Sequence, residues 1–533
     1  MQMKRRFNFL WTALLLFAAT GSVWADAPNE WDYKFIGGTP FLNYQIIQPV
    51  DATHAGEVKV IGGTTATPPV SLITDYGTAD YENVVIPSTV TNNGYIYKVT
   101  AIAGDAFQTA TNLVSVEIPG SVKEIENWIA YKGAFSGLSS LKAVKFNEGL
   151  EGIGEAAFWN TSLTDVTIPA SVTEIAISAF SGVPIKTLTF VQGSKLKTIN
   201  TFAFYAASLT NLVLPEGLDS IGEKAFAVTA VGNATLRTLV IPTSVKRLNQ
   251  TAANASFLNN TAKLVDVTVP ARWASSASTA TNNKTFAFAV SSNETLRNLT
   301  ITGANTGAGS IPSGAFWDYA SGYASTLPAT LKTLTIKEGV TEIRDSAFKS
   351  LPGITDITFP ASLVKVGGNA FIISSLENIT FTKGAKQVDL GWGAFNNSDG
   401  TPASKLKTVN LNGAVEKIGR EAFSYTLIES IDLTGVKEVK SGAFNRSNLQ
   451  GVLTIPASMT NISGAAFRSL KGVVFDYVII EGQQTAIDTS VMGSSAFNRF
   501  RETLGTFGDP GNNWGKSGIG KSRWLRQGSS SIS

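Results

Sequence analysis

Short runs in which apolar and polar residues alternate return along most of this chain, and many of them end at a proline. Examples are LVSVEIP (113–119), LTDVTIP (163–169), LTNLVLP (209–215), LRTLVIP (236–242) and ITDITFP (354–360). Such alternation over β-branched residues predicts a strand with one buried face. Proline ends the run because it lacks the N–H that a central ladder needs. Each run therefore predicts one short strand followed by a corner.

A second landmark, Ala-Phe or a close variant, follows these runs. Its Phe residues are Phe107, Phe135, Phe158, Phe180, Phe204, Phe226, Phe257, Phe288, Phe316, Phe348, Phe371, Phe395, Phe423, Phe444, Phe467 and Phe497. Most successive spacings are 21 to 24 residues, with excursions to 28 to 32. A period of this length is typical of a stacked repeat array and not of a globular enzyme.

One repeat predicts a strong strand, a corner, a shorter extended piece and a turn that carries the Phe. Its length leaves no room for a long helix beside two extended pieces. A single repeat cannot fold alone, because burying its few apolar side chains offsets too little conformational entropy. Stacking is therefore required, and we expect equivalent Leu, Val, Ile and Phe side chains to form continuous columns in the core.

The segment SLTDVTIPASVTEIAISAF (162–180) resembles the BspA-like type of leucine-rich repeat found in bacterial surface and secreted proteins. The resemblance spans roughly residues 84–497. It implies a mainly-β, right-handed solenoid of about 16 short repeats with parallel strands on one face. Many members place Cys a few residues after the Phe, where this chain has residues such as Leu138, Thr161, Leu351 and Leu470. We interpret those slots as packing positions, so this departure leaves the expected fold unchanged.

The ends of the chain lack the repeat. Residues 1–25 predict a secretory signal peptide, with Lys4, Arg5 and Arg6 before an apolar stretch and cleavage after Ala25. An uncleaved anchor is the alternative, although the apolar run is short for a membrane span. Residues 26–80 predict a small N-terminal β cap, residues 81–498 the solenoid, and residues 499–533 a basic, Gly/Ser-rich, disordered tail. We therefore expect a secreted or cell-surface protein with no membrane span after cleavage.

The amino-acid composition excludes cysteine-based chemistry and argues against a nucleic-acid partner. The chain has no cysteine, so it forms no disulfide and is not a lipoprotein that carries its lipid on cysteine. It holds 43 basic and 40 acidic residues, and residues 1–25 contain three of the basic ones. The mature chain is therefore close to neutral, and its bulk charge predicts no nucleic-acid partner.

Three features suggest chemistry without supporting it. GKSGIGKS (515–522) satisfies a phosphate-loop pattern, yet it has neither a hydrophobic strand before it nor room for a nucleotide-binding domain after it. The chain has a single histidine, His54, so any catalytic triad with a histidine would have to use it, and a zinc site there would have no second histidine ligand. Paired carboxylates such as Glu124 and Glu126 fit a solvated repeat surface. We expect no catalytic residue, metal or cofactor.

Large side chains outside the core columns are the best candidates for binding. Trp159, Tyr205 and Trp317 follow the landmark Phe directly, Tyr319 lies nearby, and Trp392 lies in another turn. Aromatic residues dominate interface hot spots, but such rings also cover neighbouring coils. Insertions around 271–284 and 303–325 predict protruding loops.

The resemblance implies an adhesin-like, non-catalytic protein that binds host matrix, host-cell or bacterial macromolecules. The partner is then an extracellular protein or a glycan. The alternative is a glycan-binding surface protein of a nutrient-capture system, which a clustered aromatic platform would favour. Scattered aromatic residues would favour binding to protein.

Overall fold

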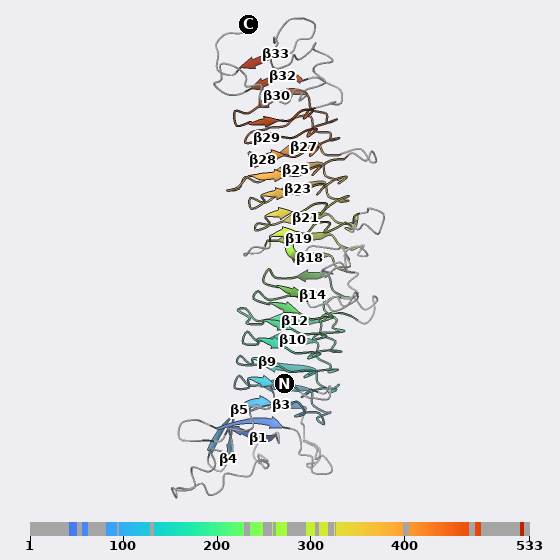
Figure 1. Ribbon diagram of the computed structural model, residues 1–533. Coiled ribbons are helices and arrows are strands. Elements are labelled where there is room, and N and C mark those ends of the chain that lie inside the picture. The colour runs from blue at the N-terminus through green and yellow to red at the C-terminus, as the bar shows by residue number, and fades with distance from the viewer. Residues whose placement is uncertain are drawn as a thin grey trace, which may run out of the picture.

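The computed structural model describes residues 42–48, 50, 56–61, 82–92, 95–127, 133–228, 235–248, 258, 263–273, 295–303, 309–317, 325, 327–397, 405–467, 475–480 and 523–526. Figure 1 shows the coils of this chain stacked into an elongated column. The architecture is a mainly-β solenoid, as the repeat period predicts. Within the described residues the sole helical element is η2 (Ala271–Trp273), a single 3-10 turn.

Most coils contribute one longer strand to the same side of the column, here named the long-strand face. These strands are β3 (Asn83–Val85), β6 (Ser115–Ile118), β8 (Ala143–Phe146), β10 (Asp165–Ile168), β12 (Thr187–Phe190), β14 (Asn211–Val213), β16 (Thr238–Val240), β18 (Asp266–Pro270), β19 (Asn298–Thr302), β21 (Thr333–Ile336), β23 (Asp356–Phe359), β25 (Asn378–Phe381) and β27 (Thr408–Asn410). Neighbours pair in parallel or lie in contact. In β10, Val166 and Ile168 are buried while Asp165 and Thr167 are exposed, which confirms the predicted alternation.

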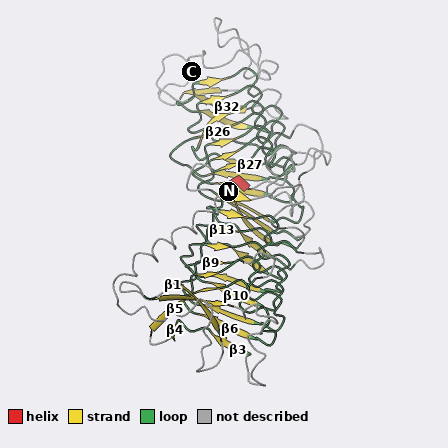
Figure 2. Cartoon of the chain, turned by 60° about the horizontal axis from the view of Figure 1, so that its bottom comes forward, coloured by secondary structure: helices red, strands yellow, loops and turns green. Residues whose placement is uncertain are grey.

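The shorter extended pieces form a second parallel array, the short-strand face. Its strands are β7 (Glu124–Ile125), β9 (Gly152–Ile153), β11 (Glu174–Ile175), β13 (Thr198–Ile199), β15 (Ser220–Ile221), β17 (Arg247–Leu248), β20 (Ser310–Ile311), β22 (Glu342–Ile343), β24 (Lys365–Val366), β26 (Val388–Leu390), β28 (Val415–Ile418), β29 (Glu438–Val439) and β31 (Asn461–Ile462). Figure 2 shows the strands stacked edge to edge along the column and joined by loops. Parallel strands therefore occupy two faces and not one.

A bulge precedes the longer strand in most coils. The carbonyl of Thr164 accepts hydrogen bonds from the amides of both Lys186 and Thr187, at 2.7 and 3.1 Å. The carbonyls of Val114, Thr210, Arg237, Val265, Arg297, Thr355 and Glu377 accept two consecutive amides in the same way. Because the bulge inserts one residue, Lys186 and Thr187 are both exposed before the alternation resumes at buried Leu188.

The Phe residues form a stacked ladder through the core. The ring of Phe180 lies parallel to those of Phe158 and Phe204, with centroids 5.1 and 5.2 Å away. The same stacking runs from Phe107 to Phe226 and from Phe316 to Phe467. These rings are all buried, so the predicted Phe column is confirmed there. Phe257, Phe288 and Phe497 lie outside the described residues.

Backbone hydrogen bonds reinforce this ladder. The amide of Phe180 donates to the carbonyl of Ala203, the residue before the next Phe, at 2.7 Å. Phe158 bonds to Ala179 in the same way at 2.8 Å. The predicted packing slots also fill the core, since Leu138, Thr161 and Leu351 are buried, whereas Leu470 lies outside the described residues.

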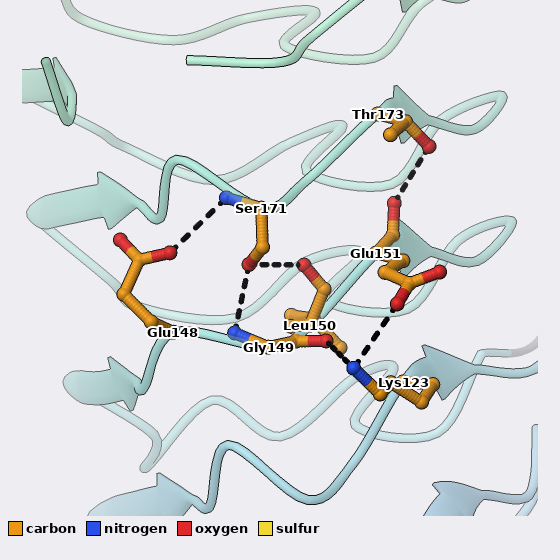
Figure 3. Close-up of polar contacts among 7 residues, drawn as sticks. All are labelled: Lys123, Glu148, Gly149, Leu150, Glu151, Ser171 and Thr173. Carbon is orange, nitrogen blue, oxygen red and sulfur yellow. Dashed lines mark hydrogen bonds and ion pairs between the residues drawn. The ribbon is translucent and has the colours of Figure 1, made fainter. Parts of the chain in front are cut away.

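A polar clasp ties neighbouring coils together at the corner between the two faces (Figure 3). The carboxylate of Glu148 accepts hydrogen bonds from the amides of Ala170 and Ser171. The hydroxyl of Ser171 accepts from the amide of Gly149 and donates to the carbonyl of Leu150. The same clasp recurs between Glu338, Gly339 and Val340 of one coil and Ala361 and Ser362 of the next.

Strands that differ from the repeat lie at both ends. β1 (Asn43–Gln48) pairs antiparallel with β2 (Gly56–Ile61), and β2 pairs in parallel with β5 (Tyr95–Ile102), to which β4 (Thr89–Asn92) is antiparallel. The strands expected near 43–50 and 57–63 are therefore present, and they continue the short-strand sheet.

At the other end, β30 (Gly451–Ile455), β32 (Phe475–Ile480) and β33 (Arg523–Arg526) form a parallel sheet. The composition of residues 499–533 predicts a disordered tail, but Arg523–Arg526 form β33. The open edge of a sheet presents unpaired N–H and C=O groups, which here pair with this late segment.

Candidate interaction surfaces

The long-strand face presents three outward rows of side chains, because each bulge adds one exposed position per coil. We name them by their members in the coil of β12. The bulge row contains Lys186, the first row Thr187 and the second row Thr189. All three rows run parallel to the column axis, because the strands pair in register.

The second row is uncharged over nine consecutive coils. Its members there are Thr167, Thr189, Val213, Val240, Thr268, Thr300, Thr335, Thr358 and Thr380. β-Branched side chains suit a pleated surface, which accounts for their presence in strands. Together they form a regular strip of hydroxyl and methyl groups along the column.

The first row carries carboxylates that hydrogen bonds hold in place. Asp356 accepts from the Thr355 hydroxyl and from the Asn378 amide nitrogen at 2.8 Å, and these bonds lower the pKa of its carboxyl. The hydroxyls of Thr164 and Thr187 lower the pKa of Asp165 in the same way. The two carboxylates therefore stay ionised at neutral pH and have neighbouring partners.

The short-strand face pairs several of its charges between adjacent coils. Lys123 forms an ion pair with Glu151 at 3.0 Å, Lys246 with Asp219 at 3.1 Å, and Lys437 with Glu416 at 2.8 Å. All six residues stand at the bulge position of this face. This arrangement leaves little net field for a charged partner.

The predicted aromatic residues do not form one platform. Trp159 and Trp392 are exposed, at 39% and 55%, but they stand at different positions in their turns. Tyr205 is half-buried and lies two coils beyond Trp159, with buried Ser181 at the equivalent place between them. Trp317 is half-buried beneath the Lys349 ammonium, 4.5 Å from its ring. Tyr319 lies outside the described residues.

A hollow opens where the long-strand sheet ends at β27. The amide of Leu427 still donates to the carbonyl of Leu406 at 2.9 Å, but within the described residues no strand pairing joins 428–433 to β27. The hollow has a volume of about 440 Å³. Its polar lining includes Lys407, Thr408, Asn410, Asn412, Glu429, Ser430 and Asp432.

Glu124, one of the features that suggested chemistry, lies in β7 on the short-strand face. Among the described residues, no group of His, Asp or Glu is arranged to hold a metal ion. Partial burial and the charges of Glu126 and Glu174 raise the pKa of Glu124. His54, residues 515–522 and most of both insertions lie outside the described residues. No helix in the described part of the chain has the length and apolar character needed to cross a bilayer.

The sequence model of the BspA type leucine-rich repeat region matches this chain in six copies, at residues 76–132, 100–233, 130–261, 184–329, 284–401 and 401–474. The chain belongs to the BspA type leucine-rich repeat family. Its membership agrees with the Phe ladder and the paired parallel strands, which recur along the described part of the column. No curated protein matches the chain.

Several solved leucine-rich repeat structures are similar to this family member. A protein from Bacteroides ovatus has 17% identity and a TM-score of 0.31, with 93% of this chain and 100% of that one covered. The pneumococcal vaccine antigen PcpA has 18% identity and a TM-score of 0.31, with 85% and 95% covered. A leucine rich cell surface protein from Faecalibacterium prausnitzii has 19% identity and a TM-score of 0.27, with 84% and 97% covered.

Sequence reasoning missed the bulge row. The bulge places two outward residues in succession, which breaks the period-two pattern just before each strand. The signal available was the recurrence of Lys or Arg at that position, as in Lys142, Lys186, Arg237, Arg297 and Lys332.

Proposed function

We propose that this protein is a secreted or cell-surface, non-catalytic, adhesin-like protein that binds a macromolecule of the host matrix, the host cell or another bacterium. The main support for this proposal is the long-strand face, because it offers a regular surface along many coils. Solenoids use such extended surfaces to hold large partners. The basic and apolar N-terminal segment supports export.

The aromatic residues play a smaller part in this proposal. Trp159, Tyr205, Trp317 and Trp392 are candidate contacts for the partner, and Tyr319 is retained from the sequence alone. The separation of Trp159 from Trp392 favours contacts of these aromatic side chains with protein over stacking on sugar rings, and it concerns no charged contact on the long-strand face. The nutrient-capture alternative therefore lacks its expected feature.

Binding of the full chain to paired arrays of extracellular-matrix proteins and glycans tests the proposal. The double variant Thr189→Tyr, Thr300→Tyr places bulky, uncharged side chains on the second row. Thr173→Tyr, Thr341→Tyr is the matched control, since both residues are exposed on the short-strand face. Saturable binding that the first variant lowers and the control retains supports the proposal. Absence of binding to every arrayed molecule contradicts it and favours a structural surface-layer role.

A further inference from the structure

The bulge row of the long-strand face is basic over much of the column. From Val114 to Thr355 it contains five basic residues and no acidic one. The basic members are Lys142, Lys186, Arg237, Arg297 and Lys332. Lys142, Lys186, Arg237 and Lys332 are exposed, and Arg297 is half-buried.

These cations differ from Lys123 and Lys246 of the short-strand face. Within the described residues, Lys142, Lys186 and Arg237 form no ion pair, whereas Lys123 and Lys246 each pair with a carboxylate of an adjacent coil. An exposed cation that forms no ion pair keeps attraction for an external anion. Of these three residues, Lys186 has the Asp165 carboxylate nearby, and its charge helps to lower the pKa of that carboxyl. The two faces therefore differ in charge although their backbone geometry is alike.

The nearby carboxylates do not cancel this charge. Between residues 142 and 335 the bulge row and the first row hold five basic side chains and two acidic ones, Asp165 and Asp266, while Lys145 of the second row is paired with Glu117 of the preceding coil at 2.8 Å. Asp165 accepts a hydrogen bond from the Thr164 hydroxyl, and Asp266 accepts one from the side-chain amide of Asn298. A net positive strip remains on a protein whose overall charge is close to zero.

The spacing of the basic residues along the column limits the kinds of partner that could pair with them. Lys142, Lys186, Arg237 and Arg297 occur in every second coil, with Thr164, Thr210 and Val265 between them. Neighbouring strands lie about 4.8 Å apart, so basic residues two coils apart are separated by about 10 Å along the column. One pyranose ring in an extended polysaccharide advances its chain by about the same distance as one coil. A disaccharide therefore matches the repeat of the basic row.

We propose that the basic row and the first row beside it bind a linear acidic polysaccharide that carries one anionic group on every second sugar. Lys142, Lys186 and Arg237 pair with successive anionic groups. Thr187, Asn211 and Thr238 of the first row lie alongside and offer hydroxyl and amide groups to the sugar hydroxyls. This inference rests on the proposed function and names the partner of the long-strand face.

Hyaluronan, which carries a carboxylate on alternate sugars, is the probe. The full chain is expected to bind it saturably, with affinity that falls as salt is added, because exposed charges are screened. The triple variant Lys142→Ala, Lys186→Ala, Arg237→Ala is expected to weaken binding by about tenfold or more, since it removes three contacts along one strip. Neutral dextran is expected not to bind.

The matched control is Lys123→Ala, Lys246→Ala, Lys437→Ala, which removes the same charge from the bulge position of the other face. It is expected to change the affinity by less than about twofold. Equal weakening by both variants, or equal competition by single-stranded poly(dT), would overturn the inference, because either result means unspecific attraction of polyanions. Failure to bind hyaluronan also overturns it. Binding to other arrayed matrix molecules in that case would leave the proposed adhesion function standing.

Discussion

The hydroxyl of Ser171 accepts a hydrogen bond from the backbone amide of Gly149, in the preceding coil, at 2.9 Å. The same hydroxyl donates to the carbonyl of Leu150 at 2.7 Å, so one small side chain satisfies two backbone groups at a corner (Figure 3). Ser244 and Ser362 make the equivalent pair of bonds. The serine after Pro-Ala or Pro-Thr in these corners therefore joins coils.

Replacing Ser171 with Ala is expected to destabilise the stack by about 1–2 kcal/mol, because the amide of Gly149 loses its partner in a partly buried place. Denaturant unfolding of the full chain measures the change. Ser162→Ala is the control, since its hydroxyl makes one exposed hydrogen bond, to the carbonyl of Ser139, and it is expected to cost less. Equal losses from both variants would contradict a special role for the clasp.

Gly149→Ala is expected to be more damaging than Gly137→Ala. Both glycines adopt positive φ, at 124° and 78°, so both substitutions strain the backbone. A Cβ at Gly149 would lie 2.0 Å from the carbonyl oxygen of Gly120, whereas a Cβ at Gly137 meets nothing within 4 Å. We expect a loss of about 1 kcal/mol for Gly137→Ala and at least twice that for Gly149→Ala. Thermal unfolding of the two variants gives the comparison, and a larger loss at Gly137 would refute it.

Phe180→Ala is expected to cost about 3–5 kcal/mol, because it leaves a cavity between two stacked rings. Ile177→Ala lies three residues earlier in the same coil and removes a side chain that is 44% exposed, so its cost is expected to stay within about 0.5 kcal/mol. Unfolding by urea distinguishes the two. Similar costs would mean that the ladder relaxes around the missing ring.

Glu124 and Glu342 occupy equivalent positions on the short-strand face but differ in pKa. Partial burial, together with the charges of Glu126 and Glu174, raises the pKa of Glu124. Burial also acts on Glu342, but hydrogen bonds from Lys365, Arg344 and Ser310 outweigh it and lower the pKa. Stability from Glu124 is therefore lost as pH rises through its folded pKa, and stability from Glu342 is lost as pH falls through its own.

Glu124→Gln is accordingly expected to raise the melting temperature near pH 7, and Glu342→Gln to lower it. For both variants, the difference in melting temperature from the wild type is expected to be smaller near pH 3, where an ordinary glutamate is protonated. Thermal unfolding of the two variants at both pH values checks the signs. A lower melting temperature for Glu124→Gln near pH 7 would contradict this explanation.

The sequence predicted those parts of the fold that depend on burial. Alternation identifies strands such as Asp165–Ile168, and the recurrent Phe identifies the core ladder, because both follow from which side chains avoid water. Surface geometry was harder to predict. The bulge that exposes Lys186 beside Thr187 depends on two amides sharing one carbonyl, and no side chain encodes that directly.

The candidate contacts were predicted only in part. Trp159 and Trp392 are exposed as expected, but Trp317 lies beneath Lys349, which comes from the next turn, 32 residues away. Strand β33 at Arg523–Arg526 was missed because its partner β32 is distant in sequence and the surrounding residues have the composition of a tail. Both errors concern contacts between coils, which a single repeat does not reveal.

The opening beside β27 has a mechanical consequence for a column that holds a partner under tension. Bonds between paired strands lie along the column axis, so a pull on the ends loads every boundary between coils in series. At this boundary strand pairing is missing from the long-strand face, and the rings of Phe423 and Phe444 are 5.6 Å apart, compared with 4.6 Å for Phe107 and Phe135. Under tension this boundary therefore has fewer backbone hydrogen bonds to resist separation on the long-strand face than the β18–β19 boundary, where five residue pairs are in register.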